Sequence, residues 1–233
     1  MADADGVAPK QDHRALKDLT VRAVSGVAMV ALLAAALYLG GPVWKAFVAL
    51  VALGTYFEWA QLSLKLTRHA VARLLWLALG VVYIGLAAKT LVDLYPPADE
   101  AGAVDIRHLL AILIAVIAVD VGAYLAGRVI GGPRIAPSIS PSKTWAGLGG
   151  GIVCATLVLI QFAPRDWSLF ALGPIVAVVA QAGDFFESWM KRRAGVKDSG
   201  QLIPGHGGLL DRVDGLIAVC FVLGIIRTLA AHA

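Results

Sequence analysis

Leu109–Gly127 reads LLAILIAVIAVDVGAYLAG, and Asp120 is its single ionisable residue. An α-helix rises about 1.5 Å per residue, so roughly 20 mostly apolar residues cross the hydrocarbon core of a bilayer. Further stretches of similar length and composition lie at about Ala23–Leu39, Val43–Leu64, Val71–Val92, Trp145–Ala163, Ser168–Met190 and Val213–Ala231. The sequence therefore predicts an all-α fold, a polytopic transmembrane helical bundle of about seven spans.

The composition agrees with a membrane protein. The chain is 59% hydrophobic and 15% charged, whereas a soluble domain carries about 25% charged residues. No soluble domain fits between the apolar blocks, so we predict one integral-membrane domain over residues 1–233. Residues 1–20 are expected to form a polar cytosolic tail and not a signal peptide. The net charge of +4 comes from residues that flank spans, which favours topology and anionic lipid over nucleic acid as its explanation.

The basic residues predict the orientation of the bundle. Fifteen of the 20 lie in the amino-terminal segment and in the second, fourth and sixth connections, which share one side if the spans alternate. Cytoplasmic connections of membrane proteins carry the excess of Lys and Arg. We therefore expect a multi-pass protein of the cell's inner membrane whose amino terminus faces the cytoplasm. The two long connections, Arg128–Thr144 and Lys191–Arg212, would then build one site facing the cytoplasm.

Carboxylates gather at the ends of several spans, where ionisable groups are costly unless paired, solvated or functional. Asp211 and Asp214 are three residues apart, which places them on one helix face. With Asp184 they would form an oxygen-rich pocket of the kind that binds Mg²⁺ together with substrate phosphates. Helix capping is the simpler alternative. We expect Glu58 to be interfacial or in a local ion pair, and Asp120 to serve either function or an interhelix hydrogen bond.

The sixth connection combines cations with flexible backbone. Lys191, Arg192, Lys197 and Arg212 surround the stretch Gly200–Gly208 (GQLIPGHGG), which contains His206. Glycine-rich backbone approaches a ligand closely and presents N–H groups to anions. Together with a carboxylate–metal site, these groups predict a polyphosphate cradle.

The fourth connection ends in Ser138–Thr144 (SISPSKT), directly before a span. Its hydroxyls and Lys143 suit either a helix cap with an interfacial lysine or a phosphate contact at the helix amino terminus. The glycines that follow, Gly147 and Gly149 to Gly151, lack the GK[ST] ending of a phosphate loop. Close helix packing is the favoured explanation for them.

The stretch from Ser188 to Asp214 resembles the signature of the phosphatidate cytidylyltransferases, the CDP-diacylglycerol synthases. The resemblance lies in SWMKR at Ser188–Arg192, KDSG at Lys197–Gly200 and IPGHGGLLDRVD at Ile203–Asp214. Upstream, SPSKTW at Ser140–Trp145 and DVGAY at Asp120–Tyr124 are similar to further motifs of that family. The catalytic region is thus expected over residues 120–214.

The resemblance implies that CTP and phosphatidate give CDP-diacylglycerol and pyrophosphate. It also implies a homodimer in the lipid bilayer. As cofactors it implies Mg²⁺ and, beside the Mg²⁺, a monovalent cation such as K⁺. We assign the metal to Asp184, Asp211 and Asp214, and catalytic roles to Asp211, Asp214, Lys191 and Lys197. Substrate binding is assigned to Ser140, Lys143, Thr144, Ser188, Arg192, Asp198, His206 and Arg212.

Two other functions compete with this one. A different membrane enzyme that uses CTP on another lipid, such as a polyprenol kinase, would need similar acidic and basic groups. A transporter would show polar residues near the membrane midplane and paired inverted repeats. The ionisable groups here gather at one face instead, which disfavours transport.

Overall fold

A computed structural model describes residues 9–97, 104–162 and 169–232. Within them lie the helices α1 (Pro9–Leu39), α2 (Gly41–Leu66), α3 (Ala70–Asp93), α4 (Arg107–Val129), α5 (Trp145–Phe162), α6 (Leu169–Ala194) and α7 (Leu210–Ala230). All 7 are long and apolar enough to cross a membrane. The predicted all-α bundle is confirmed, with one addition. The fourth connection forms a small antiparallel hairpin of β1 (Arg134–Ala136) and β2 (Ser140–Thr144).

The helix ends mostly fall within a few residues of the predicted ones. The largest difference is α1, which begins at Pro9, although its membrane-length segment begins at Leu19. Part of the predicted polar tail is therefore helical, because its polar residues include good helix formers such as Lys, Arg and Gln. Residues 1–8 of that tail, and the predicted span ends Ala163 and Ser168, lie outside the described residues.

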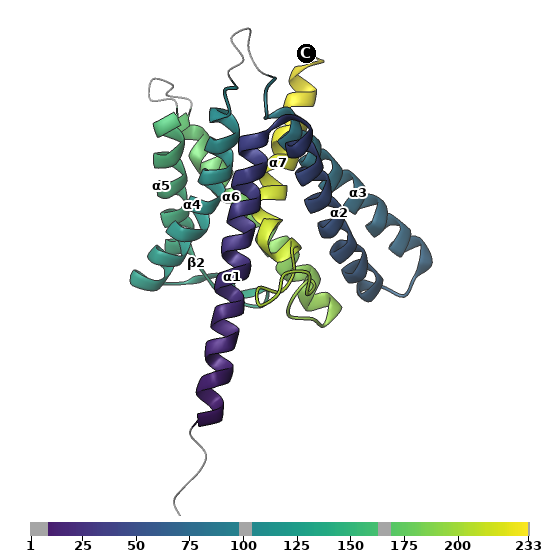
Figure 1. Cartoon of the computed structure of the whole chain (residues 1–233), viewed down its shortest axis with the longest axis vertical. Coiled ribbons are helices and arrows are strands. Elements are labelled where there is room, and N and C mark those ends of the chain that lie inside the picture. The colour runs from purple at the N-terminus through teal and green to yellow at the C-terminus, as the bar shows by residue number, and fades with distance from the viewer. Residues whose placement is uncertain (1–8, 98–103, 163–168, 233) are drawn as a thin grey trace, which may run out of the picture.

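The helices alternate in direction, so the polar connections gather at one end of the bundle (Figure 1). The α2–α3 connection, strand β2 and the α6–α7 connection all lie at this end, opposite the carboxyl terminus. The predicted pairing of the two long connections on one side is therefore present. We call this end the polar end.

Helices α4 and α5 approach each other closely at glycines. A Cβ atom added to Gly150 would lie 2.5 Å from the carbonyl oxygen of Gly122 and would also overlap the Cβ of Ala126. Small residues let membrane helices pack at short distance, where van der Waals contacts and not the hydrophobic effect hold them together. The packing explanation is confirmed for Gly147, Gly150 and Gly151, whereas a Cβ atom added to Gly149 would meet nothing within 4 Å.

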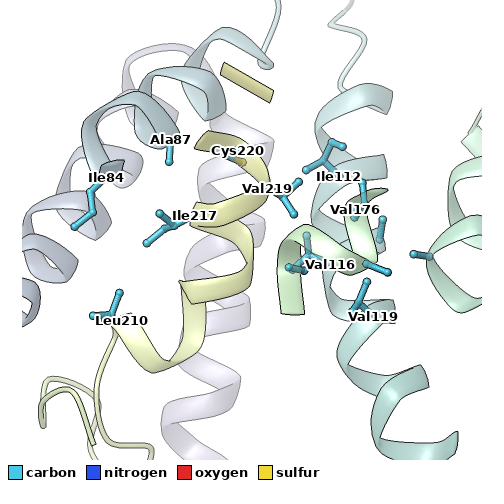
Figure 2. Packing of buried hydrophobic residues seen from close by; sticks show 14 of the residues in the cluster. Ile84, Ala87, Ile112, Val116, Val119, Val176, Leu210, Ile217, Val219 and Cys220 are labelled. Carbon is cyan, nitrogen blue, oxygen red and sulfur yellow. The ribbon is translucent and has the colours of Figure 1, made fainter. Parts of the chain in front are cut away.

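Helix α7 lies between α3 and α4 (Figure 2). Its buried Ile217 faces Ile84 and Ala87 of α3, while Val219 faces Ile112 of α4. This packing fixes the rotation of α7 about its axis. It thereby fixes where the acidic residues in the first turns of α7 point at the polar end.

Candidate active site

The first polar cluster joins β2 to α6. Lys143 Nζ forms an ion pair with Asp184 Oδ2, and Ser188 Oγ, one turn further along α6, donates a hydrogen bond to Asp184 Oδ1 at 3.3 Å. The ammonium also lies 5.3 Å from the ring centroid of Phe185, a cation–π contact. Lys143 and Asp184 are 41 residues apart in the chain, so only the folded bundle brings them together.

Two more carboxylates belong to this cluster. Asp120 of α4 and Asp214 of α7 both lie close enough to Asp184 and Lys143 to interact with them electrostatically. Among these residues, three carboxylates thus interact electrostatically with one ammonium group, which forms an ion pair with Asp184. Such an excess of negative charge in a partly buried place favours an additional cation.

The second cluster joins α6 to α7. Lys191 Nζ lies 2.5 Å from Glu187 Oε2 and 2.7 Å from Asp211 Oδ1. The Asp211 carboxylate also accepts hydrogen bonds from the backbone N–H groups of Ser199, at 3.1 Å, and Gly208, at 3.1 Å. Asp211 therefore holds both ends of the glycine-rich connection against α6.

The three predicted metal ligands are thus divided between two clusters. Asp184 and Asp214 share the first cluster with Asp120, while Asp211 is engaged in the second. In the described part of the chain, no group of three or more His, Cys, Asp and Glu side chains is arranged as a metal site. Mg²⁺ needs only one or two protein carboxylates when phosphates supply the rest. The donor set of the first cluster fits that requirement better than the predicted trio does.

Glu58 of α2, which we expected to be interfacial or in a local ion pair, is buried and contacts the signature stretch. Its Oε2 accepts hydrogen bonds from Ser199 Oγ at 3.0 Å and from the backbone N–H of Leu210 at 2.8 Å. A Cβ atom on Gly200 or Gly208 would overlap this carboxylate. The lone acid in an apolar block signalled a special role, but its partners, 141 and 152 residues away, are invisible in the sequence.

His206 contacts α1. Its Nδ1 shares a hydrogen bond of 2.8 Å with Ser25 Oγ, and its backbone carbonyl accepts a hydrogen bond from Arg212 Nη2 at 2.7 Å. Gly205 adopts φ +75 and lies against Arg22 of the same helix, a conformation that glycine tolerates without steric cost. The amino-terminal helix therefore takes part in shaping the connection that contains His206.

The remaining predicted residues differ in their surroundings. Thr144 Oγ1 accepts a hydrogen bond from the backbone N–H of Gly147 at 3.0 Å, so the capping alternative is present for this hydroxyl. Ser140 is buried at the start of β2, and the Arg192 guanidinium donates to the carbonyl of Ile139 at 3.4 Å. Lys197 and Asp198 are exposed.

Comparison with known proteins identifies the family. Residues 65–230 match the model of the Cytidylyltransferase family. The chain belongs to this family. A phosphatidate cytidylyltransferase of Brucella suis is 41% identical over 165 residues, which cover 67% of this chain and 58% of that protein. One from Rickettsia bellii is 33% identical over 224 residues, covering 91% of this chain and 92% of that protein.

The cytidylyltransferase match contains every residue that we assigned to the site. Ser25 and Glu58 precede residue 65, where the family match begins, although both contact the connection between α6 and α7. The chain spans 58% of the length of the Brucella relative.

Proposed function

We propose that this protein transfers the cytidylyl group of CTP to phosphatidate, releasing pyrophosphate, at the cytoplasmic face of the inner membrane. The observation that carries the proposal is the pair of clusters at the polar end, Lys143–Asp184 and Lys191–Asp211. They are built from the segments that match the family. The names of the Brucella and Rickettsia relatives support this choice of substrates.

The reaction requires no protein nucleophile. An oxygen of the phosphatidate phosphate attacks the α-phosphorus of CTP, the new P–O bond forms, and the bond to the β-phosphate breaks with its electrons leaving on pyrophosphate. The phosphate oxygen is already ionised near neutral pH, so no base is needed to generate it. Catalysis then consists of positioning two anions and neutralising their charge.

The residues of the chain supply these two effects. Lys191, Lys197, Arg192, Arg212 and His206 are proposed to neutralise the triphosphate. Lys143, with Ser140 and Thr144, is proposed to hold a phosphate at the amino-terminal end of α5. Lys143 and Lys191 are each paired with carboxylates, which orients both ammonium groups before substrate binds.

Magnesium is proposed to bind at Asp184 and Asp214, with Asp120 beside them. When bound, Mg²⁺ would offset the negative charge that develops on the phosphates. Asp211, assigned to the metal from the sequence, is engaged by Lys191 and two backbone N–H groups. A monovalent cation such as K⁺ beside the Mg²⁺ stays a prediction.

The proposal is tested with purified protein in detergent, phosphatidate, Mg²⁺ and CTP labelled at either the α- or the γ-phosphate. We expect α-label to enter the lipid fraction and γ-label to leave as pyrophosphate, with no transfer when any component is omitted. Entry of γ-label into lipid would instead identify a kinase. Absence of both labels from lipid would contradict the proposal.

The proposed assembly is a homodimer. Each chain has a mass of 24.3 kDa, so light scattering corrected for bound detergent should give about twice that value. A protein mass of a single chain in an active preparation would contradict the dimer without affecting the proposed reaction.

A further inference from the structure

A polar cavity of about 580 Å³ lies between α2 and the connection that follows α6. One wall is a single face of α2, where the residues are four apart, and the other is the start of the connection. Its lining includes Phe57, Gln61, Lys65, Lys197, Asp198 and Gln201.

This cavity lies next to the second cluster. Ser199 separates them: its backbone N–H donates to Asp211 at 3.1 Å, whereas its hydroxyl donates to Glu58, which also lines the cavity. Lys197 and Asp198 belong both to the cavity wall and to the predicted site. A ligand with phosphates at the Lys191–Asp211 cluster would therefore have this cavity within reach for its remaining part.

The amide and charged groups of the lining disfavour an acyl chain and suit a polar heterocycle, and Phe57, Val196 and Leu202 are its apolar members. Another cavity, of about 440 Å³, is lined by apolar side chains of α1 to α4, α7 and the connection before α7, with Thr55, Asp120 and Arg212 as polar members. The two cavities thus match two substrates of opposite solubility. The polar cavity offers amide groups, two ammonium groups and one exposed aromatic ring, and its volume lies within the usual range for small-molecule sites.

We propose that the cavity between α2 and residues 196–202 binds the cytosine base and ribose of CTP. This inference rests on the proposed function and names the part of the substrate that the cavity holds. The amides of Gln61 and Gln201 each present a donor and an acceptor, which can pair with the amino group and ring acceptors of cytosine. The ring of Phe57 provides a stacking surface, and Lys197 adds a positive charge to the cavity wall.

The first test is kinetic. Gln61→Ala and Gln201→Ala should each raise the KM for CTP about tenfold, the effect of losing one hydrogen bond, and should reduce discrimination against UTP. The kcat should stay within about twofold, because the phosphates are held elsewhere. Gln161→Ala, an exposed glutamine on α5 away from the cavity, is the matched control. If both variants behave like Gln161→Ala while α-label still enters lipid, the cavity assignment is overturned and the proposed function stands.

The second test does not depend on turnover. Gln201→Cys is labelled with a polar maleimide, using the unmodified chain as background because Cys220 is buried and Cys154 is half-buried. CTP should slow the labelling several-fold and tripolyphosphate should not. Equal protection by tripolyphosphate would identify a phosphate site, and absence of protection by CTP would exclude the nucleotide from the cavity. Either result overturns the inference.

Discussion

Among single residues, Asp211 and Asp214 are only three positions apart on α7, yet their carboxylates interact with different neighbours. Residues three apart on an α-helix are rotated by about 60° from each other, enough to direct the two carboxylates to different neighbours. Asp211 meets Lys191 and two backbone N–H groups. Asp214 lies within the electrostatic reach of Asp184 and Asp120.

Substitution of the two aspartates should therefore have different consequences. Asp214→Asn should abolish cytidylyl transfer and leave the melting temperature in detergent nearly unchanged. Asp211→Asn should abolish transfer and also lower stability by about 1–3 kcal/mol, the usual effect of weakening charged hydrogen bonds. Asp198→Asn, an exposed acid on the same connection, is the stability control. Equal melting temperatures for the Asp211 and Asp214 variants would contradict this division.

Glu58 is a second residue with a specific expectation. Glu58→Ala leaves the Ser199 hydroxyl and the Leu210 N–H buried without an acceptor, at about 1–3 kcal/mol for each unpaired group. We expect faster proteolysis within residues 200–209 and a lower melting temperature. Glu58→Gln keeps one carbonyl acceptor and should lie between Glu58→Ala and the unmodified chain. An alanine variant as protease-resistant as the unmodified chain would show that Glu58 does not hold the connection.

At the scale of elements, the α4–α5 contact places β2 and Lys143 beside α6. The two helices touch through backbone atoms, since Gly122 and Gly150 each leave no room for a Cβ atom on the other. Any side chain added there must push α5 away from α4. Because Lys143 lies just before α5 in the chain, its position beside Asp184 would shift as well.

Neighbouring glycines of α5 provide a matched comparison for this contact. Gly150→Ala should destabilise the protein by about 1–3 kcal/mol through overpacking. Gly149→Ala, where an added Cβ meets nothing within 4 Å, should be neutral or stabilising by about 1 kcal/mol or less, because alanine favours the helix. Melting curves in the same detergent measure both. Equal effects of the two substitutions would remove the close-packing argument.

At the scale of the whole molecule, the polar end collects the connections that matter for chemistry (Figure 1). Its proposed position at the cytoplasmic face gives CTP access from water and places phosphatidate's headgroup at the same depth. Because the helices alternate in direction, successive connections lie at opposite ends of the bundle. Measuring which side of the membrane one connection faces therefore gives the side of every other connection.

Cysteine accessibility provides that measurement. Thr67→Cys in the α2–α3 connection and Gly195→Cys after α6 should react with a membrane-impermeant maleimide in inverted vesicles and not in intact cells. Asp105→Cys, at the opposite end, should show the reverse. A reversed pattern for all three positions would place the polar end outside, and a mixed pattern would contradict the alternation itself.

The membrane spans and the signature stretch could be predicted from the amino-acid sequence alone. Both are local properties: the length of an apolar run decides whether a helix crosses the bilayer, and the motifs that carry the family resemblance are short continuous stretches. The predicted ends of α4 and α5 therefore lie close to the observed ones. Fold class and family followed from the chain without knowledge of any contact.

Which side chains meet at the polar end depends on how the helices pack in the folded bundle. Helix rotation about its own axis depends on packing against all neighbours, as for α7 between α3 and α4, and no local pattern encodes it. For this reason the sequence grouped Asp184, Asp211 and Asp214 in one site, whereas in the fold Asp184 and Asp214 lie with Asp120, and Asp211 is paired with Lys191. For the same reason Ser25 and Glu58, far away in the chain, emerged as partners of the glycine-rich connection only in the folded bundle.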